Sequence, residues 1–185
     1  GSTGAGNDQV RFDMIFHIMI PGVEIITPIR DLKLSREEEI SYLKAKGVDM
    51  NFAKAVYSIN KGLWGTSVGG KETLSSKGML PEEAWPTQVT KTGTEEVKLG
   101  FVKGELTTVN DQSFGHPTEA IQYLQTIAGP YGIGRDIHVG DTIIGIKGRV
   151  GFEAAAPMLI LKGHHALEKH VLSKWQLQWI DQLAA

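Results

Sequence analysis

The sequence feature that most constrains the fold is the stretch YSINKGLWGTSVGGK at residues 57–71. Its glycines and serines disfavour a long helix or strand, and small residues suit a loop whose backbone passes close to a ligand. Residues 55–59 are predicted to form a strand that delivers Ser58 to this loop. The stretch is therefore predicted to be a loop that contacts a substrate, and a purely structural loop is the alternative.

The end of this stretch has the spacing of a phosphate-binding P-loop, Gly65-x4-Gly70-Lys71. That motif needs a serine or threonine directly after the lysine, because the hydroxyl group ligates magnesium. Here Glu72 follows, and its carboxylate would repel a phosphate. The motif also needs a buried strand before it, whereas residues 61–64 make a poor strand. A P-loop is therefore rejected.

The composition excludes several classes of function. With 185 residues, 41% hydrophobic and 22% charged, the chain has the make-up of one large globular domain or parts of two. A net charge of -2 gives no general attraction for nucleic acid or acidic membranes. The absence of cysteine removes disulfide and thiolate chemistry. Neither a signal peptide nor an apolar run of membrane-spanning length is visible.

The first third of the chain mixes clear and ambiguous signals. Large apolar residues occupy every second position of residues 10–20, as in a strand. The apolar run is also long enough for a buried helix, and both alternatives stay open. Residues 23–27 are predicted to form a short β-branched strand. Ser35-x-x-Glu38 is a capping box that starts a helix, and Gly47 ends it.

The middle of the chain carries the strongest local signals. Trp85 precedes a proline, so it is expected to be extended, and it is predicted to anchor a core. Within residues 96–109 apolar residues occupy alternate positions before Lys103-Gly104, which suits a turn, and this pattern predicts a β-hairpin. His116 precedes a proline at the first position of an amphipathic helix that runs to about residue 128.

The last third is predicted to contain a buried strand at residues 143–146 and then helix from residue 153 to the end. Large apolar residues recur every fourth position along one face of this helix. Either another subunit or the inside of the domain would cover them. They are Leu167, Val171, Trp175, Trp179 and Leu183.

Two further motifs are rejected. The histidines at 164, 165 and 170 lack the spacing of metal ligands, so no metal site is predicted. Gly132-Ile-Gly134 lacks the third glycine and the preceding strand of a dinucleotide-binding fingerprint. The residues alone thus predict an α+β protein with two glycine-rich polar loops, at residues 3–8 and 57–71, that suit small polar ligands.

Several ordered motifs are more specific. They are Thr3-Gly-x-Gly-Asn-Asp-Gln-Val-Arg-Phe12, Ile25-x-x-Pro-x-Arg30, Tyr57-Ser-x-Asn-x-x-Leu-Trp-Gly-x-Ser67, Gly134-Arg135 and Gly145-Ile-Lys-x-Arg149. With these motifs in this order, the chain closely resembles argininosuccinate synthases over essentially all of its length. The resemblance implies an ATP-dependent carbon–nitrogen ligase of arginine biosynthesis. Such enzymes condense citrulline and aspartate to argininosuccinate through a citrullyl-adenylate.

The resemblance also implies a domain organisation. Residues 1–47 would be the tail of an α/β nucleotide-binding domain, residues 48–172 an α+β synthetase domain of mixed sheet and helices, and residues 173–185 the start of a long oligomerisation helix. The family's Ser-Gly-Gly-Leu-Asp-Thr-Ser pyrophosphate motif is absent from these residues. The chain is therefore expected to be a C-terminal portion, inactive alone, of a cytoplasmic homotetramer that binds neither nucleic acid nor membrane. The start at Gly1 without methionine fits a piece of a longer protein or a cloning remnant.

Site residues follow from the same resemblance, position by position. It implies an aspartate site, a citrulline site and a contact to ATP with Mg²⁺, with no metal held by the protein alone. Aspartate would contact Thr3, Asn7 and Asp8, citrulline would contact Asn7, Arg11, Ser58 and Ser67, and ATP would contact Gly1, Ser2, Thr3 and Gly4.

Three positions depart from the family pattern. The family commonly has lysine at Ala5, and it has citrulline-binding glutamate and tyrosine at Gly140 and Phe152. Losing hydrogen-bonding groups from a polar site reshapes recognition. Either Asp141 or Glu153 holds the α-amino end instead, or the substrate is a modified citrulline such as an acylated one. A non-catalytic amino-acid-binding or assembly module is the remaining alternative.

Overall fold

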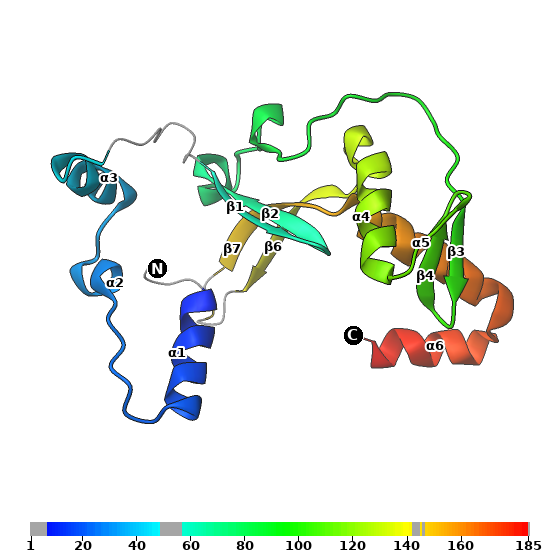
Figure 1. Ribbon diagram of the computed structural model, residues 1–185, viewed down its shortest axis with the longest axis horizontal. Helices are drawn as coiled ribbons and strands as arrows, with labels where there is room; N and C mark the ends of the chain where they lie inside the picture. Colours follow the sequence, from blue (N-terminus) through cyan, green and yellow to red (C-terminus); the bar gives the residue numbers. More distant parts are fainter. Residues whose placement is uncertain (1–6, 49–56, 142–144, 146, 185) are drawn as a thin grey trace. The chain divides into compact units, whose positions relative to one another are not determined.

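The computed structural model describes the backbone of residues 7–48, 57–141, 145 and 147–184 (Figure 1). The chain divides into two compact units. Unit 1 comprises residues 1–56 and 139–149, and unit 2 comprises residues 57–138 and 150–185. Helices combine with two separate antiparallel sheets, so the predicted α+β class is confirmed.

Unit 1 contributes three described helices, α1 (Asn7–Met19), α2 (Pro28–Leu32) and α3 (Arg36–Ala45). Residues 10–19 of the ambiguous stretch 10–20 are therefore helical. Its apolar residues surround the helix rather than forming one stripe, and Phe12 and Phe16 stack with ring centroids 6.2 Å apart on its exposed surface. A hydrogen-bonded ion pair of 2.6 Å between Arg30 and Asp13 connects α2 to α1.

The strand predicted at residues 23–27 does not form. These residues pair with no strand in the described part of the chain, and β-branched residues without a ladder gain nothing from extension. Pro28 opens α2 instead of ending a strand, because its fixed φ suits the first helical turn. The capping box of α3 is confirmed: Ser35 Oγ accepts from the backbone of Glu38, and the Glu38 carboxylate accepts from the backbone of Ser35. This backbone hydrogen bond is the main reason why the pKa of Glu38 is lowered.

The stretch 57–71 is a β-hairpin, not the predicted loop. Strand β1 (Ser58–Gly62) pairs with β2 (Gly65–Gly69) around a turn at residues 63 and 64. The predicted strand at 55–59 is displaced, since β1 starts at Ser58, and residues before 57 lie outside the described part. Gly65 has φ +139°, which a residue with a side chain rarely adopts, so glycine here shapes the turn rather than breaking the strand.

The hairpin belongs to a four-stranded sheet in the order β1-β2-β7-β6 (Figure 1). Strand β7 (Lys147–Glu153) pairs antiparallel with β2, and β6 (Arg135–Asp141) forms the far edge. A small core lies on one side of this sheet and contains Val68, Leu80, Ala84 and Trp85. Trp85 is 9% exposed and extended, as predicted, and it follows the 3₁₀ helix η3 (Glu82–Ala84).

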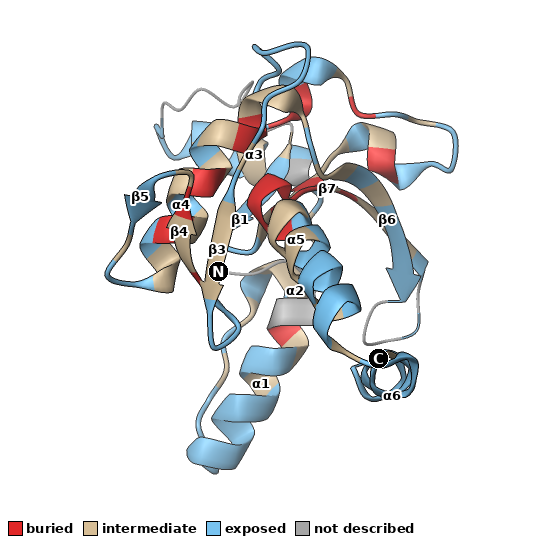
Figure 2. Cartoon of the chain, turned by 90° about the vertical axis from the view of Figure 1, so that its right-hand side faces the viewer, coloured by how far each residue is buried: buried red, intermediate tan, exposed pale blue. Residues whose placement is uncertain are grey.

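The second sheet, β3 (Leu99–Val102), β4 (Glu105–Val109) and β5 (Gln112–Ser113), confirms the predicted hairpin. Lys103 and Gly104 both have positive φ, as a two-residue hairpin turn requires. Helix α4 (Pro117–Ala128) starts where predicted, with His116 Nδ1 accepting from the backbone of Thr118. The main core joins β4, α4 and α5 through Leu106, Val109, Ala120, Leu124 and Ala156 (Figure 2).

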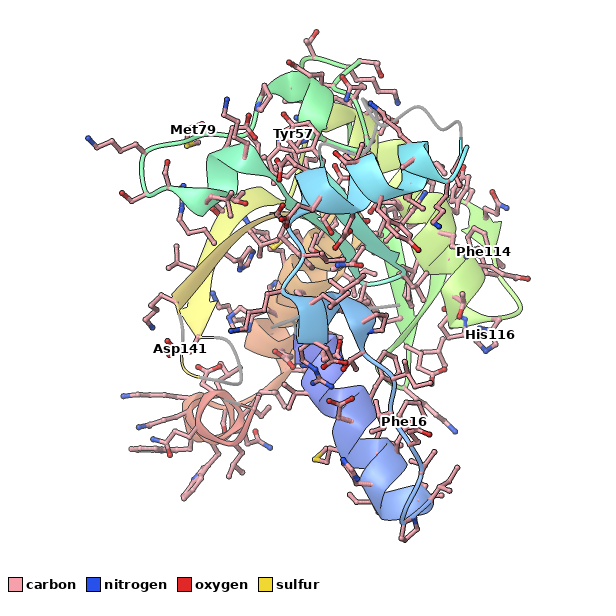
Figure 3. All side chains as sticks on the ribbon, turned by 90° about the vertical axis from the view of Figure 1, so that its left-hand side faces the viewer. Phe16, Tyr57, Met79, Phe114, His116 and Asp141 are labelled. Carbon is pink, nitrogen blue, oxygen red and sulfur yellow. The ribbon has the colours of Figure 1, made fainter. Side chains whose placement is uncertain are left out.

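The prediction of one continuous helix from residue 153 to the end is wrong. Glu153 ends strand β7, and two helices follow, α5 (Ala155–Val171) and α6 (Lys174–Leu183). Leu172 is extended, and Ser173 forms a capping box with Gln176 that starts a new helix. The side chains of α6 point outward on all sides (Figure 3). The recurring apolar residues are exposed, by 47% to 79%: Leu167, Val171, Trp175, Trp179 and Leu183.

Two predictions remain, a strand at residues 143–146 and the absence of a membrane-spanning run. The strand predicted at 143–146 falls mostly outside the described residues. Within the described ranges, no helix combines the length and the apolar character that crossing a membrane would require.

Candidate functional site

The β1–β2 hairpin places Ser58 and Ser67 on the same side of the four-stranded sheet. In the register of the pair, Ser58 lies opposite Gly69 and Asn60 lies opposite Ser67. Residues directly opposite each other in an antiparallel pair point to the same face, and side chains alternate along each strand. The two serines are therefore diagonal neighbours, about 7–8 Å apart between Cα atoms.

The two faces of this hairpin differ sharply in burial. Val68 and Thr66, on the face away from the serines, are 0% and 6% exposed, and Val68 belongs to the Trp85 core. Ser58 and Asn60 are exposed, and Ser67 is half-buried. The neighbours of Ser67 on the same face of β2 are Gly65 and Gly69, which carry no side chain to cover it. A polar and accessible sheet face results.

The same face continues onto the next two strands. Phe152 of β7 lies directly opposite Ser67, and its ring covers Gly65 so closely that a Cβ there would collide with it. The ring of His138, on the neighbouring strand β6, packs edge-on against Phe152 with centroids 5.2 Å apart. We call the set Ser58, Asn60, Ser67, Phe152 and His138 the polar face.

The polar side chains of this face are not engaged by the protein. In the described part of the chain, neither the two serines nor Asn60 forms a side-chain hydrogen bond. Polar groups left open at a surface are available to water or to a ligand. The polar face can therefore offer hydroxyl and amide groups to a small polar molecule.

A polar network fixes the strands beneath this face. The guanidinium of Arg135 donates to Glu82 at 2.6 and 3.1 Å and to the carbonyl of Thr87. It also lies 5.0 Å from the ring centre of Trp85. Glu153, only 6% exposed, accepts from the hydroxyl of Thr87 at 2.8 Å and lies 4.0 Å from Arg135 Nε.

This network was not predicted from the sequence, although Gly134-Arg135 belongs to one of the ordered motifs. It also bears on the departures from the family pattern. The carboxylate of Glu153 is occupied inside unit 2, which argues against Glu153 as the replacement contact for a substrate. Asp141 forms an exposed ion pair of 2.8 Å with Lys147.

The network predicts a pH dependence of stability. Hydrogen bonds from Arg135, and then from the backbone of Val89, hold the pKa of Glu82 below its ordinary 4.5. A carboxylate with a lowered folded-state pKa stabilises the fold above its unfolded pKa, and this contribution is lost as the pH falls through the folded-state value. Glu82→Gln should therefore lower the urea midpoint at neutral pH, and the difference from the unsubstituted chain should shrink below pH 4.5.

Glu83→Gln, which changes the adjacent exposed carboxylate, is the matched control for this titration. It should change the urea midpoint at neutral pH much less than Glu82→Gln does, because the hydrogen bonds of Arg135 go to Glu82. An equal effect of both substitutions would contradict the role of the Arg135 contact.

The segment that resembles a P-loop is built differently. Gly70 precedes the 3₁₀ helix η2 (Lys71–Leu74), in which the Thr73 hydroxyl bonds to the Gly70 backbone. The hydroxyl of Tyr57 donates to Glu72 at 3.5 Å. Burial and the charge of Glu72 raise the pKa of Tyr57. Residues 65–69 thus form a strand, and the Glu72 carboxylate that follows contacts Tyr57, in line with the rejection of this motif.

The other predicted site residues belong to unit 1. Asn7, Asp8 and Arg11 lie in the first turns of α1, with Asn7 and Arg11 four positions apart along the helix. Arg11 is exposed. The ATP contacts and the aspartate contact Thr3 fall outside the described residues, as do most of the residues between β6 and β7. No three His, Asp or Glu side chains of the described ranges converge as metal ligands.

The fold and the polar face define a two-unit α+β protein that presents small polar side chains to a ligand. Comparison with known proteins identifies the family. The model of the "Arginosuccinate synthase C-terminal domain" matches residues 57–185, and that of the "Arginosuccinate synthase N-terminal HUP domain" matches residues 1–49. The chain belongs to the argininosuccinate synthase family.

Curated relatives named argininosuccinate synthase agree with this assignment. That of Methanocaldococcus jannaschii is 40% identical over 97% of this chain and 46% of its own length. Those of Sulfurisphaera tokodaii and Pyrococcus furiosus are 33% and 35% identical, over 98% and 97% of this chain and 48% and 44% of theirs. The chain thus spans about half the length of the curated relatives it matches.

Proposed function

We propose that this chain forms the amino-acid-binding part of an ATP-dependent ligase that condenses citrulline with aspartate to argininosuccinate, through a citrullyl-adenylate, in arginine biosynthesis. One observation carries the proposal. Ser58 and Ser67 share an accessible sheet face, and their hydroxyl groups have no hydrogen-bond partner in the described part of the chain. Membership of the argininosuccinate synthase family supplies the substrate class.

In this proposal the two serine hydroxyls hold the charged end of citrulline. Hydroxyl groups donate to a carboxylate, and two diagonal donors fix its orientation better than one. The guanidinium of Arg11 suits the same chemistry. Aspartate would be held by Thr3, Asn7 and Asp8, and citrulline also by Asn7.

ATP, with Mg²⁺, supplies the activation of the ureido oxygen. Its proposed contacts Gly1, Ser2, Thr3 and Gly4 lie outside the described residues, so no geometry is assigned to the nucleotide. What the chain's own residues contribute is binding and orientation. The hydroxyls fix one end of citrulline, and its ureido group stays free to react at the other end.

We also propose the domain organisation implied by the resemblance. Residues 1–47 would continue a nucleotide-binding domain, residues 48–172 would form the synthetase domain, and residues 173–185 would start an oligomerisation segment. The exposed tryptophans of α6, Trp175 at 67% and Trp179 at 62%, support a contact with other subunits of a cytoplasmic homotetramer.

The test is Ser67→Ala in an active protein, obtained by completing the chain with the part of the M. jannaschii relative that lies outside the match. A hydrogen bond to a charged group contributes about 1.5–3 kcal/mol, so the KM for citrulline should rise about tenfold or more. The KM for ATP should stay the same, because Ser67 does not contact the nucleotide in this proposal. Pyrophosphate release measures both constants.

Ser113→Ala, on the exposed strand β5 of the other sheet, is the matched control and should leave the KM for citrulline unchanged. An unchanged KM for citrulline in Ser67→Ala would refute the assignment of the polar face. An amino-acid-binding module without catalysis is the second candidate, because the polar face lies entirely in unit 2. Citrulline binding by the 185-residue chain without pyrophosphate release in the completed protein would favour it.

A further inference from the structure

Asn60 is the residue of β1 that pairs with Ser67 on the polar face. The two residues are opposite each other in the β1–β2 register, so their Cβ atoms lie about 4.5–5.5 Å apart on one face. Phe152 lies opposite Ser67 on the other side. Asn60, Ser67 and Phe152 therefore form one row across three strands, with His138 packed against its end.

The side chain of Asn60 is open for binding. It is exposed, and in the described part of the chain it makes no side-chain hydrogen bond. Its amide combines a carbonyl acceptor with an NH₂ donor, whereas the nearby serines are the hydroxyl donors of the site. Gly62, two positions further along β1 on the same face, adds no side chain that would shield it.

We propose that Asn60 is a further substrate-binding residue, whose carbonyl oxygen accepts a hydrogen bond from the α-ammonium group of the amino acid held by Ser58 and Ser67. This inference rests on the proposed function and adds the orientation of the substrate to it. A carboxylate and an ammonium group on one carbon are adjacent. A pair of hydroxyl donors beside an amide acceptor therefore matches both charges of an α-amino acid at once.

Phe152 supports this orientation from the far side of Ser67. Its ring covers the backbone at Gly65 and is half-buried, so it provides an apolar surface next to the polar pair. The methylene groups of an amino acid such as citrulline suit that surface. The charged end then lies over Asn60 and Ser67, and the side chain extends across Phe152 toward His138.

The test titrates the 185-residue chain, labelled with ¹⁵N, with citrulline. The side-chain amide signals of Asn60 should shift together with the backbone signals of Ser67. Asn60→Ala should weaken binding about tenfold, because a bond to a charged group is lost. Asn60→Asp should bind citrulline at least as tightly as the unsubstituted chain, because a carboxylate favours an ammonium group.

Lys61→Ala is the matched control, because Lys61 is the next residue of the same exposed strand and points to the opposite face. It should leave the Kd unchanged. The inference is overturned if Asn60→Ala binds like the unsubstituted chain while Ser67→Ala is weakened. An Asn60→Asp chain weakened as much as Asn60→Ala also overturns it, since the ammonium group would then not lie there. If Ser67→Ala and Asn60→Ala both bind normally, the proposed function of this face fails as well.

Discussion

Arg135→Met is expected to lower the free energy of unfolding of unit 2 by about 3 kcal/mol. The substitution keeps an apolar side chain of similar length but leaves Glu153, which is only 6% exposed, without its neighbouring cation. It also removes the hydrogen bonds to Glu82 and Thr87 and the contact with the Trp85 ring. Urea unfolding followed by far-ultraviolet circular dichroism at neutral pH measures the loss.

The double variant Arg135→Met, Glu153→Gln separates the causes. If the uncompensated carboxylate produces most of the loss, removing its charge should recover a substantial part of the stability. Glu153→Gln alone should be destabilised less than Arg135→Met, because Thr87 can still donate to the amide oxygen. A loss below about 1 kcal/mol for Arg135→Met, as is usual for exposed ion pairs, would show that the network contributes little.

Leu124→Ala is expected to have an effect of the same size on the main core. Leu124 is 0% exposed and lies in the cluster that joins α4 to β4 and α5. Deleting a fully buried leucine side chain costs about 2–5 kcal/mol, from lost burial and from the cavity left behind. The same urea titration should therefore show a large decrease in midpoint.

Leu161→Ala is the matched control, because it removes the same atoms from α5 at a site that is 56% exposed. Its effect should stay below about 1 kcal/mol, since surface substitutions rarely change stability by much. Equal losses in the two variants would contradict the assignment of the main core.

The elements that could be predicted are those whose signals are local. Lys103-Gly104 and His116-Pro117 define a turn and a helix start within a few residues, and both appear where predicted. The break between α5 and α6 was also encoded locally, in the capping box from Ser173 to Gln176. It was missed because apolar residues keep a four-residue spacing on both sides of the break.

The hairpin at residues 57–71 could not be predicted in the same way. Glycine weakens a strand in isolation, but Gly65 is covered here by the ring of Phe152, which lies far along the chain. The candidate site likewise contains residues that sequence motifs predict and residues that only tertiary packing brings together. Motifs pointed to Ser58 and Ser67, whereas the place of Asn60 beside Ser67 and of Glu153 beside Thr87 depends on strand register and tertiary packing.

The packing of Trp85 beneath Arg135 has a practical consequence for spectroscopy. Of the four tryptophans, Trp85 is 9% exposed, whereas Trp64, Trp175 and Trp179 are 50%, 67% and 62% exposed. A soluble quencher should therefore extinguish the emission of three indoles and spare that of Trp85. The quencher-resistant signal would therefore report whether Trp85 stays packed against Arg135.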